Sequence, residues 1–297
     1  MHPLLKSLAV TVLPRPVVEA LRARYRRSNV EIVTPEGETV VKPEWEMMPN
    51  IDEVWQASEG WAHGSIADRQ VEKWEAFIES FTGAEPFGRS HEAAPDAPID
   101  VSAHNTILTF AYLLGRIAAE RTAAAPSVLD WGGGIGHYYQ YARALYPATE
   151  WDYWLKDLSE LCEAGAPRNP GAHFSSDDAQ VLSRRYDLVF ASSSLHYTRD
   201  VYGLIDQLCG AAGKYLMVTR TPFVEDHDDF VVVQRPHRYG YFTEYAGWFL
   251  NRKRFQDFIE ARGFRLDREF LLAERPHVPN APEQCRYRGF MFRRIEG

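Results

Sequence analysis

The sequence is poor in cysteine, in long apolar runs and in positive charge. Its 297 residues include three cysteines, Cys162, Cys209 and Cys285, and no CxxC pair, which argues against a cysteine-based zinc site and predicts a reducing compartment, the cytoplasm. The best candidate for a membrane span, residues 4–13, is far shorter than the ~20 apolar residues required, so we expect no integral membrane association. With 33 Lys and Arg against 41 Asp and Glu, the net charge of −8 disfavours nucleic acid as a partner.

Aromatic residues, in contrast, are abundant. The chain has 8 Trp, 15 Tyr and 16 Phe, 13% of all residues, which is more than a core of this size needs. Because aromatic side chains often line ligand cavities, we expect some of them to form a pocket for a small molecule. They concentrate around Trp55, Trp61 and Trp74 and in the segment 239–248.

The pattern of apolar residues changes near residue 122. Between residues 51 and 120, apolar side chains recur at spacings of three and four, which predicts helices, and residues 17–27 form a further basic helical stretch. From residue 123 onward, short apolar runs alternate with helical patterns, which is typical of an α/β fold. We therefore expect a helical N-terminal extension or lid at 1–122 and an α/β domain at 123–297. Its seven expected strands are 127–130, 151–156, 172–174, 186–191, 214–219, 264–272 and 287–293.

The strongest local motif is VLDWGGGIG, in which a buried strand ends at Asp130 and Gly132, Gly134 and Gly136 follow. Glycines at a strand-to-helix turn let the backbone approach a nucleotide closely. A dinucleotide motif would require another glycine where His137 stands, and a phosphate-binding loop would require a lysine that is missing. A carboxylate at Asp130 repels pyrophosphate but suits an ammonium group beside a sulfonium. The motif therefore predicts S-adenosylmethionine as the ligand.

Acidic residues follow the second and third expected strands. Asp157 is placed to hold ribose hydroxyls, with Leu158 against the adenine face, although capping of the next helix is an alternative for Asp157. Asp177 or Asp178 is expected to accept from the adenine amino group, and Ala179 to offer its backbone N–H to the ring. A helix N-cap is an equal alternative for both aspartates.

The fourth expected strand runs into hydroxyl residues at the edge where ligands of α/β sheets bind. Ser192 is expected to contact the cofactor, and Tyr197 the acceptor. His196 is our first choice for a general base, because an imidazole titrates near neutral pH, and a packing role is the alternative.

A polar cluster follows the fifth expected strand. It contains Arg220, expected to bind the acceptor, and His227, a second candidate base within the acidic run 225–229. That run is either a divalent-cation site or an exposed loop, and we assign no metal. Farther on, Tyr241 and Trp248 are candidates for lining the acceptor pocket, with a place in the core as the alternative.

Over residues 127–294 these motifs resemble the class I S-adenosylmethionine-dependent methyltransferases. The resemblance depends on VLDWGGGIG, the acid after the second strand, DDA after the third, YDLVFASSSLHY and the late hairpin. The Trp-rich helices, TRTPF and GWFLNRKRF are more narrowly similar to a bacterial group of methyltransferases without an assigned substrate. The resemblance implies a Rossmann-like seven-stranded sheet in the order 3-2-1-4-5-7-6, with the last strand antiparallel and N-terminal helices over the cofactor. Trp131 departs from the small residue usual at its position.

The function that this resemblance implies is methyl transfer from S-adenosylmethionine to a small-molecule acceptor, in secondary metabolism or glycan modification. Two alternatives stay open: a non-catalytic protein that binds S-adenosylmethionine, and a nicotinamide-dependent oxidoreductase. The Trp-rich N-terminal helices also offer a surface for a homodimer. The sequence does not distinguish methylation of O, N, S or C.

Overall fold

The computed structural model describes residues 29–33, 37–50, 52, 55, 60–84, 86–88, 99–120 and 124–295. The basic helical stretch expected at 17–27 lies outside these residues. No helix in the described ranges is both long and apolar enough to cross a membrane. The three cysteines are buried and unpaired by disulfides.

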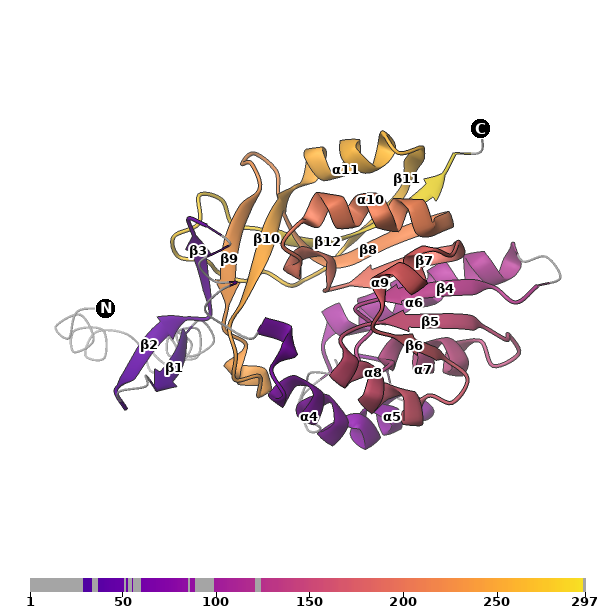
Figure 1. Ribbon diagram of the computed structural model, residues 1–297, viewed down its shortest axis with the longest axis horizontal. Coiled ribbons are helices and arrows are strands. Elements are labelled where there is room, and N and C mark those ends of the chain that lie inside the picture. Colours follow the sequence, from indigo (N-terminus) through magenta and orange to yellow (C-terminus); the bar gives the residue numbers. More distant parts are fainter. Residues whose placement is uncertain are drawn as a thin grey trace.

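The α/β fold class is confirmed. All seven expected strands are present; helices separate the first six along the chain, and the last two pair as a hairpin (Figure 1). The strands are β4 (Ser127–Trp131), β5 (Asp152–Lys156), β6 (His173–Ser175), β7 (Tyr186–Ser192), β8 (Ala212–Val224), β11 (Phe264–Leu271) and β12 (Arg286–Arg294). The helices between and before them are α6 (Val101–Ala119), α7 (His137–Leu145), α8 (Ser159–Gly165), α9 (Asp178–Leu182), α10 (Val201–Ala211) and α11 (Arg252–Glu260).

The strands pair around β4, the strand that precedes the glycine motif. β6, β5, β4, β7 and β8 form parallel neighbours in that order, β12 pairs with β8 in the antiparallel sense, and β11 pairs with β12. The carboxyl ends of the five parallel strands therefore lie along one edge of the sheet.

The sheet is buried on both faces, as the continuous apolar runs predict. Along β7, Leu188 and Phe190 pack in one cluster with α6 and α7, while Val189 and Ala191 pack in the other with α10 and α11. Because side chains alternate across a strand, one short apolar segment supplies both cores.

The helical N-terminal extension expected at 1–122 also contains strands. Helices α4 (Ser65–Glu72) and α5 (Trp74–Thr82) are present, but they follow a hairpin of β1 (Asn29–Val33) and β2 (Thr39–Pro43) and a strand β3 (Trp45–Met48). These strands have four or five residues, too few for an alternating pattern to stand out.

The sheet is also larger than the seven strands expected. In the described part of the chain it has ten, because β3, β9 (Phe230–Gln234) and β10 (Tyr245–Asn251) extend it from the far end of β8. Figure 1 shows these three at one end of the sheet, with the β1–β2 hairpin beyond them. By pairing with β9, β3 connects the N-terminal segment to the C-terminal part of the sheet. The division into two domains at residue 122 stays a prediction.

Candidate functional site

A cavity of about 470 Å³ opens at the carboxyl edge of the sheet. Its size falls in the range of small-molecule sites. Its lining comes from the glycine motif, the ends of β5 and β7, the 3₁₀ helix Leu195–Tyr197, β8, β10 and the N-terminal segment around Trp61. Residues from across the whole chain therefore meet at this one place.

The glycine motif forms a tight loop between β4 and α7. Gly132, Gly134 and Gly136 have φ angles of 73°, 59° and 100°, a left-handed region that other residues adopt at a cost. A Cβ at Gly132 would lie 2.2 Å from the Ser194 Cβ, so a side chain there would collide with the segment after β7. Gly132 and Gly134 line the cavity, whereas Gly136 packs against Asn169 and does not.

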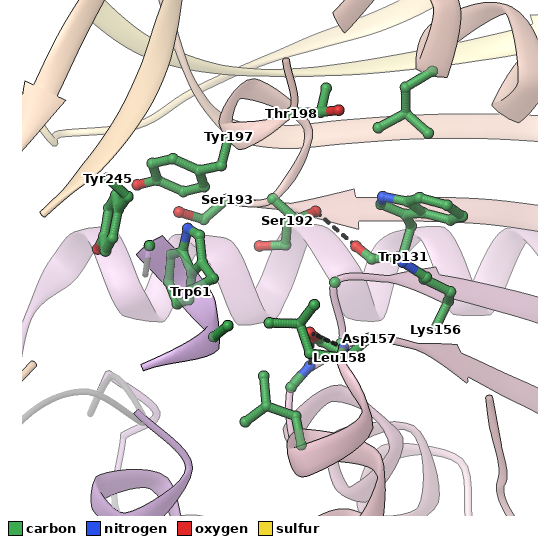
Figure 2. Close-up of a pocket in the computed structure, with 18 of the residues that line it drawn as sticks. Trp61, Trp131, Lys156, Asp157, Leu158, Ser192, Ser193, Tyr197, Thr198 and Tyr245 are labelled. Carbon is green, nitrogen blue, oxygen red and sulfur yellow. Dashed lines mark hydrogen bonds between the residues drawn. The ribbon is translucent and has the colours of Figure 1, made fainter. Parts of the chain in front are cut away.

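Asp157 connects the glycine loop to the end of β5. Gly134 N–H donates to Asp157 Oδ2 at 2.7 Å, and Leu158 N–H donates to Oδ1 at 2.8 Å (Figure 2). Burial raises the pKa of this carboxyl, while the two amide donors act against that shift. Asp157 and Leu158 both line the cavity, and α8 begins after Leu158 without a side-chain cap, so the capping alternative for Asp157 is not observed.

Asp130 lies behind the loop. Its side chain is 1% exposed, it accepts from the Tyr153 hydroxyl at 3.1 Å, and it is not among the residues that line the cavity. It packs against Gly133, where a Cβ would lie 2.8 Å from Asp130 Oδ2. Burial raises the pKa of Asp130 to about 8, so the carboxyl is largely protonated near neutral pH.

The two aspartates after β6, Asp177 and Asp178, have different roles in the structure. Asp177 is the N-cap of α9, accepts from Ala179 N–H at 2.9 Å and stays outside the cavity, which is the alternative weighed for it. Asp178 does line the cavity and forms an ion pair of 2.7 Å with Lys156. The Lys156 ammonium lies 4.6 Å from the Trp131 ring centre, so this pair and the indole form one rim of the cavity.

The end of β7 supplies three serines to the cavity. Ser192 shares a hydrogen bond of 2.8 Å with the Tyr138 hydroxyl, and the Ser194 hydroxyl donates to the Trp131 carbonyl at 2.6 Å. Ser193, between them, has a φ of 54°. Burial raises the pKa of Tyr138 to about 12, so its hydroxyl remains neutral at physiological pH.

Trp61, Tyr197 and Tyr245 form one side of the cavity, which we call the aromatic wall (Figure 2). Trp61 stacks on Tyr245 with ring centres 4.6 Å apart, and Tyr197 lies within 5.1 Å of both rings. Tyr197 Oη donates to Gln234 at 2.8 Å, which ties the wall to β9. Three segments far apart in sequence therefore build one apolar surface.

His196 does not lie where a general base is expected. It is fully buried and does not line the cavity, and neither ring nitrogen has a hydrogen-bond partner in the described structure. Burial, with a smaller contribution from the charge of Arg220, lowers the pKa of His196 to about 3. An enclosed imidazole of such low basicity is unsuited to proton transfer near neutral pH, so the geometry favours the packing role.

His227 lies in an exposed loop away from the cavity. The backbone N–H groups of Glu225, Asp226 and His227 all donate to the Glu283 carboxylate, which folds the acidic run around that side chain. Within the described residues, no group of three or more His, Cys, Asp or Glu side chains is arranged to hold a metal ion.

Of the four residues predicted to contact the acceptor, two line the cavity and two do not. Tyr197 and Arg220 line the cavity. Tyr241 is 1% exposed within the core, and Trp248 donates its indole N–H to the Thr198 carbonyl at 3.1 Å; neither lines the cavity. For Tyr241 the structure therefore shows the core alternative.

One lining residue, Gln70, has no clear signal in the sequence. Gln70 of α4 is buried and accepts from Ile135 N–H at 3.3 Å, so the N-terminal segment touches the glycine loop directly. Nothing in the pattern of α4 distinguishes this glutamine from a surface one. Tyr138 and Lys156, in contrast, adjoin recognised motifs and could have been found by extending them.

Comparisons with known proteins give one family. Residues 103–269 match the model of a family described as a methyltransferase domain. No curated protein matches the chain. Among solved structures, magnesium protoporphyrin IX methyltransferase from Synechocystis PCC 6803, crystallised with S-adenosylmethionine, is 12% identical, with a TM-score of 0.49 over 83% of this chain and 99% of that one. An S-adenosylmethionine-dependent methyltransferase from Clostridium acetobutylicum is 11% identical, with a TM-score of 0.43 over 64% and 92%. The two structural likenesses are too distant to assign residues.

Proposed function

This chain belongs to the methyltransferase domain family, and from that premise we propose that it transfers a methyl group from S-adenosylmethionine to a small-molecule acceptor. One observation carries the proposal: a single cavity is lined at once by the glycine loop with Asp157 and by the aromatic wall. A group transfer requires its two ligands side by side in fixed orientation, and this cavity has two chemically different halves in which to hold them.

The proposed cofactor half consists of Gly132, Gly134, Asp157, Leu158 and the rim pair Lys156–Asp178. The left-handed glycines allow close approach to the backbone, and Leu158 offers an apolar contact for a base. Each Asp157 oxygen accepts one amide bond and has further acceptor capacity, which suits ribose hydroxyls. S-adenosylmethionine, when bound, supplies a methyl group on a positively charged sulfur.

The proposed acceptor half consists of the aromatic wall, Ser193, Thr198, Arg220 and Ala246. His196 and His227 do not line the cavity, and Tyr138, which does, is too weak an acid to be ionised near pH 7. His137 lines the cavity as well, from the start of α7 behind the glycine loop. The contribution that we propose for the acceptor half is to orient the acceptor and to exclude water from it. Acceptors of secondary metabolism and of glycan modification both remain candidates.

A turnover screen tests this proposal. Purified protein is incubated with S-adenosylmethionine and a panel of phenols, amines, carboxylic acids and sugars, and S-adenosylhomocysteine is quantified. We expect at least one acceptor to support turnover. We expect Asp157→Ala to reduce this turnover by about 100-fold, because the variant loses the two proposed charge-assisted hydrogen bonds to the ribose hydroxyls. Asp206→Asn, which alters an exposed carboxylate paired with Arg262, is the matched control.

The same screen separates the alternatives. Tight binding of S-adenosylmethionine with no turnover on any acceptor would favour a non-catalytic binding protein. Binding of NAD in place of S-adenosylmethionine would overturn the proposal in favour of an oxidoreductase.

A further inference from the structure

Helix α4 turns one polar side chain toward the glycine loop. Its buried residues are Ile66 and Gln70, and a spacing of four places them on one face of the helix. Ile66 packs in an apolar cluster with residues of α6 and α7, whereas Gln70, which is 5% exposed, places an amide on the same face. A buried amide costs free energy unless its polar atoms find partners. Both ends of the Gln70 amide therefore require one.

One end of this amide has its partner. Ile135 N–H donates to Gln70 Oε1 at 3.3 Å. Because a backbone N–H can only donate, this bond identifies the oxygen end of the amide and turns Nε2 to the other side. Within the described part of the chain, no residue accepts from Nε2, and Nε2 is not enclosed. Gln70 lines the cavity, so the two N–H donors of Nε2 are open to a ligand.

The surroundings of Nε2 favour an anion over a cation. A Cβ at Gly134 would lie 2.8 Å from Gln70 Oε1 and 3.6 Å from Nε2, so the amide lies directly beside the glycine loop. Helix α7 begins at His137, close to the backbone N–H that Gln70 accepts, and the N-terminal end of a helix favours negative charge. Asp130, behind Gly133, adds little negative charge near neutral pH, because burial raises its pKa to about 8.

The helix that presents Gln70 is fixed against the start of α7. Helix α5 follows α4 after one residue, and its Trp74 and Phe77 pack against the His137 ring, with ring centres 5.3 and 4.6 Å apart. Trp74 and Phe77 are each 5% exposed. A helix that is held in place before a ligand arrives loses less entropy when its amide binds that ligand.

The chemistry of the cofactor decides which of its groups suits these donors. Asp157, the proposed ribose ligand, accepts from Gly134 N–H, and Gln70 lies beside the same glycine, so one ligand can contact both side chains. The amino-acid end of S-adenosylmethionine has a carboxylate, which accepts hydrogen bonds, and an ammonium group, which donates them. An amide whose oxygen is already bonded offers donors, so it selects the carboxylate.

Building on the methyl transfer proposed above, we propose that Gln70 binds the α-carboxylate of S-adenosylmethionine through Nε2. The bond from Ile135 N–H aligns the amide, and the carboxylate supplies the partner for its other end. Gln70 lies outside residues 103–269, the part of the chain that matches the family model. The N-terminal segment of this chain therefore adds a contact of its own to the cofactor site.

Calorimetric titration with two ligands tests the proposal. S-adenosylhomocysteine has the carboxylate, and S-adenosyl-3-thiopropylamine is the same molecule without it. We expect wild type to bind S-adenosylhomocysteine about tenfold more tightly than the amine analogue, which is the effect of one charge-assisted hydrogen bond. Equal affinities of wild type for the two ligands would overturn the proposal.

A variant at position 70 assigns this preference to the amide. Gln70→Glu keeps the length of the side chain and an oxygen for Ile135 N–H, but it replaces the two N–H donors with a second oxygen that repels a carboxylate. The preference for S-adenosylhomocysteine should disappear or reverse. Affinity for the amine analogue should fall by no more than about threefold, which also shows that the variant is folded.

Two further variants complete the test. Gln70→Met keeps a similar volume without polar N–H or oxygen atoms, so it should abolish the preference without reversing it. Gln207→Glu is the matched control, because it makes the same chemical change at an exposed residue of α10 that does not line the cavity. It should keep the wild-type preference.

Two outcomes distinguish failure here from failure of the proposed function. If S-adenosylhomocysteine binds but is not preferred over the amine analogue, or if Gln70→Glu keeps the preference, the role of Gln70 is overturned and methyl transfer stands. If the preference depends on Gln70 but no acceptor supports turnover in the screen above, the role of Gln70 stands and methyl transfer is overturned.

Discussion

The two halves of the cavity are built in different ways. The proposed cofactor half comes from three short stretches, the loop after β4, the end of β5 and the start of α9, and the hydrogen bond from Gly134 to Asp157 joins the first two. The acceptor half comes from segments as distant as Trp61, Tyr197 and Tyr245. The first half depends on local backbone geometry, and the second depends on how distant elements pack. Substitutions in the two halves should therefore have separable effects.

Gly132→Ala should have the largest effect on stability. A side chain at a φ of 73° and 2.2 Å from the Ser194 Cβ combines backbone strain with a collision, so we expect the free energy of unfolding to fall by about 3 kcal/mol. Gly210→Ala, within α10 and with no atom within 4 Å of the new Cβ, should instead gain up to about 1 kcal/mol. Urea denaturation measures both, and equal effects would show that the loop is not conformationally restricted.

Trp61→Ala should disturb the acceptor half and spare the cofactor half. Loss of the stacked indole is expected to lower the free energy of unfolding by about 2 kcal/mol, less than for a fully buried tryptophan. Affinity for S-adenosylhomocysteine should stay within about threefold. Phe242→Ala, at an aromatic residue that is 59% exposed and does not line the cavity, is the control and should cost under about 0.5 kcal/mol. A large loss of cofactor affinity in Trp61→Ala would mean that the halves are coupled.

Asp130→Asn should change how stability depends on pH. The folded-state pKa of about 8 exceeds the ordinary value of 3.8, so between those pH values the folded protein holds a proton that the unfolded chain releases. Wild-type stability therefore declines as pH rises through this window, and the asparagine variant lacks that contribution. Relative to wild type, the variant should gain at least about 1 kcal/mol between pH 5 and pH 8. Urea denaturation of both proteins at pH 5 and pH 8 measures this. An equal difference in unfolding free energy between wild type and variant at the two pH values would contradict a buried, protonated Asp130.

His227→Ala should have the smallest effect. The side chain lies outside both halves of the cavity, in an exposed loop ordered by Glu283 through backbone contacts. Turnover should remain within about twofold of wild type and the unfolding free energy within about 0.5 kcal/mol. A strong loss of activity would require the loop to reach the acceptor.

Most of the proposed cofactor half could be predicted from local patterns in the sequence. The α/β alternation placed β4, β5 and β7, and the end of each strand then indicated the residues that meet at one edge. Gly132, Gly134, Asp157 and Ser192 line the cavity because chain direction alone brings them there. Their individual roles in binding remain predictions.

Much of the acceptor half could not be predicted from the sequence, because it depends on tertiary packing. Periodicity does not distinguish Trp61, which lines the cavity, from Trp74, which is 5% exposed in the core. Strand β10 was not among the expected strands, and alternation alone would not have identified its cavity residues: Ala246 and Trp248 share one face of the strand, yet Ala246 lines the cavity and Trp248 does not. His196 follows a strand end as predicted, but the 3₁₀ helix there turns its ring into the interior while Tyr197 faces the cavity.

The most direct test of the two-halved cavity is calorimetric titration of S-adenosylhomocysteine into wild type, Asp157→Ala and Arg220→Gln. We predict one binding site in wild type, a loss of about 100-fold in Asp157→Ala and a change within about threefold in Arg220→Gln. No binding to wild type, or an equal loss in both variants, would contradict it.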